Sequence, residues 1–200
     1  MFFKQIKKNG DNFSYLLADE DTREAAIVDP SFNPDFLLEL AQKNNNKIKY
    51  VINTHQHRDH VEGNEKIKSR SASKIVAHKQ SRVSKDVEVV DGDTIKIGKV
   101  EIKVIHTPGH SPGHVCIVVG DILLSGDHVL SHKIPQQWPE SIHPYTGLGH
   151  YLDSLEKVER LEGISLVLGG HEAPFDDLAG RVHEIRRLQH RRLDRVLRIL

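Results

Sequence analysis

The seven residues from Thr54 to His60 hold four side chains of the types that bind metal ions in proteins. These side chains are His55, His57, Asp59 and His60. They follow the apolar segment Tyr50-Val51-Ile52, which predicts a short buried strand. Because alternate residues of a loop can turn toward one point, His55 and His57 can share one ion while Asp59 and His60 face a second position. Imidazole with carboxylate suits zinc, iron or manganese, and the absence of a thiolate argues against a purely structural zinc site.

Further donor side chains follow three other predicted strands. They are His110, Asp127 and His171. His110 ends the turn Thr107-Pro108-Gly109-His110, in which proline and glycine fix the backbone. Asp127 and His171 each come directly after an apolar run that closes with glycine. Donors at four strand ends predict one convergent site, because a chance distribution of histidines does not readily produce that pattern.

The surrounding sequence predicts strands and helices that bring these loops together. Expected strands cover residues 13–18, 25–28, 50–52, 74–77, 87–90, a hairpin over 94–105 that turns at Gly98, a hairpin over 115–119 and 122–124, and 165–168. Expected helices begin after Asn33-Pro34 and cover 62–69, 151–161 and 178–200. Short strands that lead into helices, twice over, indicate an α/β (α+β) protein with two sheets sandwiched between helices.

We expect the 200 residues to form one domain. The formal net charge is zero, which gives no electrostatic case for nucleic acid or a membrane surface. The single cysteine, Cys116, lies in an apolar run and is expected to be a small buried side chain in a cytoplasmic protein. Lysines near the N-terminus argue against a secretory signal, and no apolar run approaches the roughly 20 residues of a membrane span.

The motifs taken together resemble the metallo-β-lactamase superfamily, and within it the glyoxalase II-like hydrolases. They are T-H-x-H-x-D-H at 54–60, T-P-G-H at 107–110, S-G-D at 125–127 and G-H at 170–171, in family order. The resemblance covers nearly the whole chain and implies a four-layer αββα sandwich with the metals at one edge of the sheets. It implies that one ion is held by His55, His57 and His110. It also implies that a second ion is held by Asp59, His60 and His171, and that Asp127 bridges the two.

The resemblance implies a hydrolase that acts on a small molecule, most simply a thioester or ester, as a hydroxyacylglutathione hydrolase does. Two divalent ions, with zinc favoured over iron or manganese, would share a hydroxide that attacks the carbonyl carbon. Asp59 and Asp127 would orient this hydroxide and accept its proton. Ser111 and Ser125 are interpreted as turn residues, because no free His–Asp pair is assigned to activate them.

Three other functions fit the same motifs. A persulfide dioxygenase of this family would hold a single iron through the equivalents of His55, His110 and Asp127. Small nucleases of the fold use the same seven ligands. A catalytically silent scaffold is the third, because Gly169 stands where the family commonly has proline and Glu172 where it has glycine. Lactam-hydrolysing members of the family usually lack an acidic residue where Asp127 stands, which disfavours antibiotic hydrolysis. Flavo-diiron members carry glutamate where this chain has His57, which disfavours that role.

Several residues near the expected site have roles that the motifs leave open. The predicted substrate contacts are Trp138, His143, Tyr145 and His128. Glu172 would accept a hydrogen bond from a ligand histidine or face solvent. Packing or surface roles are expected for His78, His106, His114, His183 and His190. The arginines of the last helix predict a solvated face, and that helix stops within its apolar periodicity, as a docked end or a shortened chain would.

Overall fold

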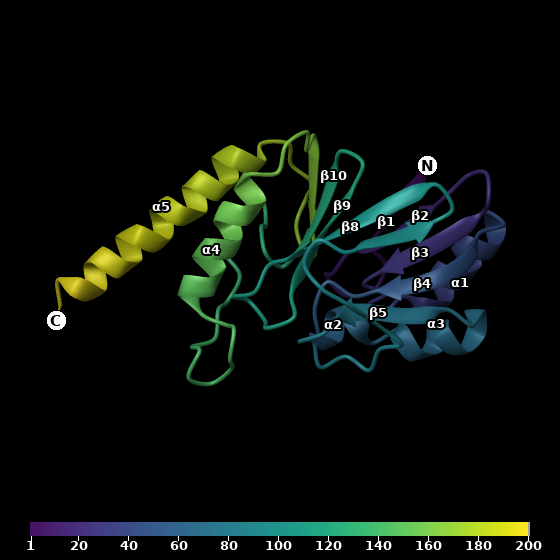
Figure 1. Cartoon of the computed structure of the whole chain (residues 1–200), viewed down its shortest axis with the longest axis horizontal. Helices are drawn as coiled ribbons and strands as arrows, with labels where there is room; N and C mark the ends of the chain where they lie inside the picture. Colours follow the sequence, from purple (N-terminus) through teal and green to yellow (C-terminus); the bar gives the residue numbers. More distant parts are fainter. Residues whose placement is uncertain (200) are drawn as a thin grey trace.

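The computed structural model describes residues 1–199, and it places two sheets face to face between two layers of helices (Figure 1). The predicted order of helix, sheet, sheet and helix is confirmed. Two of the helices cover the outer face of the first sheet and two cover the outer face of the second. Within residues 1–199, none of the helices combines the length and apolar character that crossing a membrane requires.

The first sheet contains six strands in sequence order. They are β1 (Phe2–Ile6), β2 (Ser14–Ala18), β3 (Glu24–Val28), β4 (Lys47–Ile52), β5 (Lys74–His78) and β6 (Val87–Val89). The first three strands pair antiparallel, and the strands from β3 to β6 pair parallel. The sequence pattern missed β1, whose residues are mostly half-buried, because an edge strand has only one covered side.

The second sheet contains five strands in the order β11-β10-β9-β8-β7. They are β7 (Thr94–Ile97), β8 (Val100–His106), β9 (Val115–Val119), β10 (Ile122–Gly126) and β11 (Leu166–Gly169). The strands β7 to β10 pair antiparallel, and β11 joins β10 in parallel. It follows that β8, β10 and β11 run in one direction, so their carboxyl ends lie at the same edge of the sheet.

The helices lie outside both sheets. They are α1 (Pro34–Lys43), α2 (Arg58–Val61), α3 (Asn64–Ser71), α4 (Leu148–Glu159) and α5 (Leu178–Leu197). The helix predicted over 62–69 is two helices, since α2 begins within the histidine motif and α3 starts at Asn64. The helix predicted over 151–161 starts three residues earlier and ends two residues earlier.

Strand alternation divides the apolar side chains among three layers of core. Ala26 and Val28 of β3 point into the layer between the sheets, while Ala25 and Ile27 point outward against α1 and α3. The third layer packs α4 and α5 on the outer face of the second sheet, and it includes Cys116. The prediction that Cys116 is a buried side chain is confirmed, and burial raises the pKa of its thiol to about 12.

Helix α5 projects away from α4, and its second half lies on the side of the molecule opposite the first sheet (Figure 1). The apolar side chains of its first half, Leu178, Val182 and Ile185, are buried. Those of the last turn are not, since Val196 is 56% and Leu197 is 70% exposed. A docked helix end, one of the two alternatives for this helix, therefore does not agree with the residues that the structure describes.

Candidate metal centre

The carboxyl ends of the parallel strands bring the predicted ligands of the first group together. Atoms of His55, His57, His110 and Asp127 all lie within 4.8 Å of one another. The closest pair is His110 Nε2 and His57 Nδ1, at 3.1 Å. Asp127 Oδ2 lies 3.7 Å from His110 Nε2 and 3.9 Å from His55 Nε2. These four side chains come from the loops after β4, β8 and β10, although they are up to 72 residues apart in the sequence.

The second group consists of Asp59, His60 and His171, whose donor atoms also lie within 4.8 Å of one another. Asp59 Oδ2 is 3.3 Å from His171 Nε2 and 3.6 Å from His60 Nε2. Asp127 reaches this group as well, since its Oδ2 lies 3.3 Å from His171 Nε2 and its Oδ1 lies 3.7 Å from His60 Nε2. The Asp127 carboxylate therefore stands between the two groups.

The donor atoms fit divalent ions. Two donors at zinc bond lengths of about 2.0–2.1 Å and tetrahedral angles stand about 3.4 Å apart, which is close to the distances between these side chains. Among residues 1–199, His55 Nε2, His60 Nε2 and Asp127 Oδ1 are buried and have no hydrogen-bond partner. Buried polar atoms without a partner are uncommon in folded proteins, and metal coordination would satisfy all three.

The surroundings of the histidines in the first group favour neutral imidazole rings. Burial lowers the pKa of His55 far below its usual value, and the neighbouring histidines lower it further. Burial is also the main cause of the lowered pKa of His57 and of His110. Neutral imidazole is the form that binds a metal, so these three side chains need to lose no proton first.

The second group carries charge. An interaction with His171 lowers the pKa of Asp59 to about 2. Burial lowers the pKa of His171, but hydrogen bonds to Asp127 and Asp59 outweigh this effect and raise the pKa to about 10. His60 behaves in the same way, because the Asp29 carboxylate more than offsets its burial and raises its pKa.

Asp29 supports the site through contacts with His60 and Thr54, a role that the sequence interpretation missed. Its Oδ2 lies 2.9 Å from His60 Nδ1, which leaves His60 Nε2 free to face the second group. Its Oδ1 accepts the Thr54 backbone N–H at 2.8 Å, and its Oδ2 accepts the Thr54 hydroxyl at 2.6 Å. The available signal was an acidic residue directly after the buried strand β3, the same pattern that identified Asp127.

His110 and Asp127 are also held in place from behind. The Gln136 carbonyl lies 2.8 Å from His110 Nδ1, so this nitrogen donates and Nε2 is left as the acceptor. The Asp127 backbone N–H donates to His114 Nε2 at 3.1 Å, and His114 Nδ1 then donates to Thr107 Oγ1 at 2.8 Å. The packing role expected for His114 is confirmed, and its contact also fixes the backbone that carries the bridging carboxylate.

Two glycines allow the loops to approach this closely. Gly126 has a φ of +50°, and a methyl group there would lie 2.8 Å from His114 Nε2. A methyl group on Gly170 would lie only 2.5 Å from Asp127 Oδ1. Since real side chains do not reach such distances, any larger residue at 126 or 170 would displace the ligands beside it.

The predicted substrate contacts have different outcomes. His128 is fully buried against His114 and Tyr151, so the prediction that it touches substrate is wrong: the residue after a strand-end ligand points back into the core. Trp138 and Tyr145 are 42% and 50% exposed, and His143 is half-buried beside Trp138. All three lie on the segment that ends at Thr146, which forms a β-bridge with Gly109, the neighbour of His110. Their contact with substrate stays a prediction.

Glu172 takes neither of its two predicted positions. Its Oε2 accepts hydrogen bonds from the backbone N–H groups of His132 and Lys133 and from the Ser131 hydroxyl. The acid near the other ring nitrogen of His171 is instead Asp11, with its Oδ2 3.3 Å from His171 Nδ1. Glu172 therefore ties the segment after β10 to the loop after β11.

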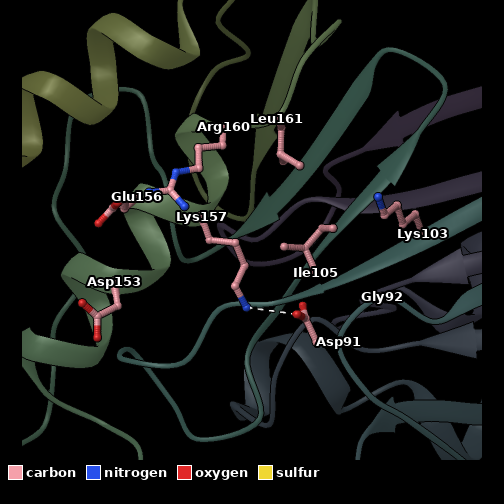
Figure 2. Close-up of a pocket in the computed structure, with 9 residues that line it drawn as sticks. All are labelled: Asp91, Gly92, Lys103, Ile105, Asp153, Glu156, Lys157, Arg160 and Leu161. Atoms are coloured by element: carbon pink, nitrogen blue, oxygen red, sulfur yellow. Dashed lines mark hydrogen bonds and ion pairs between the residues drawn. The ribbon is translucent and has the colours of Figure 1, made fainter.

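A cavity of about 610 Å³ opens elsewhere, between the end of β8 and α4 (Figure 2). Lys157 Nζ lies 3.2 Å from Asp91 Oδ2 within it, and none of the seven candidate ligands lines it. Its lining balances three acidic side chains against three basic ones. The cavity is therefore separate from the metal-binding groups, and its charges favour neither an anion nor a cation.

The chain belongs to the metallo-beta-lactamase superfamily. The model of this family matches residues 9–85 and 77–197, which together cover nearly all of the chain and all seven candidate ligands. The two sheets, the outer helices and the donors at strand ends all agree with this assignment. The resemblance inferred from the four motifs is thereby confirmed.

Curated relatives of the chain include two proteins named as hydroxyacylglutathione hydrolases. The hydroxyacylglutathione hydrolase of Rhodospirillum rubrum is 34% identical over 175 residues, covering 84% of this chain and 65% of the relative. The hydroxyacylglutathione hydrolase of Arabidopsis thaliana named cytoplasmic is 41% identical over 112 residues, covering 54% of this chain and 43% of the relative. The matched segment thus spans about two thirds of the first relative and less than half of the second.

Solved structures show the same fold. The crystal structure of ETHE1 from Myxococcus xanthus has a TM-score of 0.80 and 24% identity, covering 90% of this chain and 85% of that one. A metallo-beta-lactamase family protein from Thermus thermophilus has a TM-score of 0.81 and 20% identity, covering all of this chain and 82% of the other. At these identities the likeness establishes the arrangement of the chain and not its chemistry.

Proposed function

We propose that the chain is a metal-dependent hydrolase that cleaves a small thioester or ester, with a hydroxyacylglutathione as the first substrate to test. The observation that supports this most is the position of Asp127, whose two oxygens lie 3.3 to 3.9 Å from histidines of both groups. A carboxylate shared in this way suits two ions that act together. The names of the curated relatives suggest the substrate class.

His55, His57 and His110 would hold the first ion, Asp59, His60 and His171 the second, and Asp127 both. Two divalent ions, which we propose to be zinc, would supply a hydroxide at neutral pH and polarise the carbonyl group under attack. The carboxylates of Asp59 and Asp127 are the groups that would orient a water molecule and accept its proton. Asp59 is about one third exposed and Asp127 almost buried, so Asp59 is the more accessible to substrate.

The residues around the ligands keep this geometry fixed before substrate binds. Asp29 and the Gln136 carbonyl hold His60 and His110 in the orientation that turns Nε2 toward the site. Trp138, His143 and Tyr145 would form a wall for the acyl group on the segment after residue 131. We also propose a cytoplasmic location, which fits a single buried cysteine and the name of the Arabidopsis relative.

The test is hydrolysis of a hydroxyacyl thioester of glutathione by protein loaded with zinc. The released free thiol is the measured product. We expect turnover that disappears after chelation and returns with zinc. We expect no such turnover in Asp127→Ala. Oxygen consumption with glutathione persulfide by iron-loaded protein, without thiol release from the thioester, would contradict the proposal and indicate a dioxygenase. The first group and Asp127 together hold the three side chains that such an enzyme would use.

A further inference from the structure

Asn12 is a buried asparagine in the loop between β1 and β2. Its side chain is 1% exposed, and its Oδ1 has no hydrogen-bond partner among the residues that the structure describes. A buried oxygen without a partner is uncommon in folded proteins, so such a group calls for a specific explanation. No motif in the sequence pointed to it.

The hydrogen bonds of this segment connect it to both loops of the second group. Asn12 Nδ2 donates to the Asp59 carbonyl at 3.2 Å, and the next residue, Phe13, donates its N–H to the Gly170 carbonyl at 2.6 Å. Because a carbonyl only accepts, the amide must turn Nδ2 toward Asp59, and Oδ1 points the other way. Asn12 and Phe13 thus join the loop that carries Asp59 and His60 to the loop that carries His171.

The free oxygen of Asn12 lies beside the second group. A methyl group on Gly170 would lie 3.0 Å from Asn12 Oδ1, 2.9 Å from His60 Cε1 and 2.5 Å from Asp127 Oδ1. These three side chains therefore surround one face of Gly170. Asp127 Oδ1 and His60 Nε2 are also buried without a hydrogen-bond partner among residues 1–199, and they lie 3.7 Å apart. Three unpartnered donor or acceptor atoms gather on this side of the site.

We propose that Asn12 is a positioning residue of the second metal position. Its Nδ2 holds the backbone of Asp59, and its Oδ1 presents a neutral oxygen toward an ion held there and the water around that ion. A neutral oxygen suits this place, because Asp59 and Asp127 already provide two negative charges and His60 and His171 complete the set. The proposal rests on the proposed metal centre and goes beyond it by assigning a residue to one of its two halves.

The experiment is a titration of metal-free protein with Co²⁺, which reports both the number of ions bound and their absorption spectra. Wild type is expected to bind two ions. Asn12→Ala is expected to bind the second ion about 10–100-fold more weakly, the range seen when a supporting group of a metal site is removed, and the first ion normally. Asn12→Asp keeps an oxygen at the same place but loses the donor to the Asp59 carbonyl, so we expect it to weaken the second ion less than Asn12→Ala does.

The matched control is Asn33→Ala. Asn33 Oδ1 accepts the Asn9 backbone N–H at 2.8 Å, so this change loosens the same loop at a point that contacts none of the seven ligands. Asn33→Ala is expected to bind both ions normally, and thermal unfolding of the metal-free proteins would show that each variant is folded. If Asn33→Ala weakens the second ion as much as Asn12→Ala does, general order in the loop explains the effect and the proposal is wrong.

Two further results would overturn it. Normal binding of both ions by Asn12→Ala would show that the side chain is dispensable, and equal weakening in Asn12→Asp and Asn12→Ala would show that only the bond to Asp59 matters. The proposed function fails separately. If wild type binds two ions and the variants bind as expected, the Asn12 assignment stands even when the protein does not cleave thioesters. If wild type binds only one ion, the Asn12 assignment is wrong whether or not hydrolysis is seen.

Discussion

The two halves of the candidate metal centre, one of three histidines and one of two histidines with an acid, differ in how the chain holds them. The first half, His55, His57 and His110, is built from neutral rings whose pKa values burial lowers. The second half, Asp59, His60 and His171, has a carboxylate and two histidines whose pKa values nearby acids raise. Asp127 lies near histidines of both sets, and the two sets also meet at the rings of His55 and His60, whose centroids are 4.0 Å apart.

The supports of the two halves differ in the same way. His55 and His110 lie in loops that follow β4 and β8 directly, within the packed edge of the two sheets. The second half depends on contacts with Asp29 and with the loop between β1 and β2. Polar contacts hold both halves, and the comparison indicates that they differ in charge: a backbone carbonyl holds His110, whereas the Asp29 carboxylate holds His60.

Removal of the bridging carboxylate should have the largest effect, because it belongs to both halves. In Asp127→Ala we expect thioester turnover to fall roughly 10³-fold or more, the scale of several kcal/mol of lost transition-state stabilisation. Initial rates and metal content would be measured together on the same sample. Turnover within tenfold of wild type would show that the carboxylate does not act at the centre.

Single ligand changes should separate the halves. We expect His171→Ala to retain one tightly bound ion and His110→Ala to lose the first position and weaken the second, since His110 lies beside the shared Asp127. Equilibrium dialysis against limiting zinc would measure both, with His190→Ala on the exposed part of α5 as the control. Identical losses in the two ligand variants would contradict the division into two halves.

The two positions should differ in their dependence on pH. His171 has a raised pKa of about 10 in the metal-free protein, so it is protonated at pH 7 and must lose that proton to bind an ion. Its contribution to the stability of the metal-free fold is full below the unfolded pKa and is lost as pH rises through about 10. We therefore expect second-ion affinity to rise from about pH 6.5 to about pH 8.5 and first-ion affinity to stay nearly constant.

Calorimetric titration in buffers of different ionisation enthalpy would count the protons released with each ion. The expected pattern is a larger release for the second ion than for the first. Equal release at both steps, or a larger release at the first, would mean that the charge difference between the halves has been assigned the wrong way round.

Loss of Asp29 should weaken the second half more than the first. In Asp29→Ala, His60 loses the acceptor at its Nδ1, and we expect second-ion affinity to fall about 10–100-fold. The first ion should be affected less, because Asp29 reaches His55 only through Thr54. Zinc titration with a chromophoric competitor measures both constants, and a larger loss at the first position would argue against the assignment.

Glu172→Gln should have the smallest effect. The substitution weakens three hydrogen bonds to residues 131–133 but touches no ligand. We expect a loss of about 1 kcal/mol in the free energy of unfolding, measured by denaturant titration, with two ions still bound. A lost ion would show that the segment after β10 belongs to the metal centre more closely than these contacts indicate.

The sequence was sufficient to predict that the seven candidate ligands lie close together, because they follow apolar strands whose ends meet at one edge of the fold. The sequence was not sufficient to predict the residues that hold these ligands in position. Asp29, His114 and Asn12 act through contacts with residues 13 to 47 positions away, which no local pattern encodes. The failure at His128 has the same origin, since only the packing of α4 shows that its ring is covered.

The most direct test of the two-metal account is elemental analysis of wild-type protein that has been loaded with zinc and dialysed, with turnover of the glutathione thioester measured on the same sample. We expect two zinc ions per chain and hydrolysis that rises with the second ion. One iron per chain with oxygen consumption and no hydrolysis, or less than half of an ion of any metal, would contradict the account.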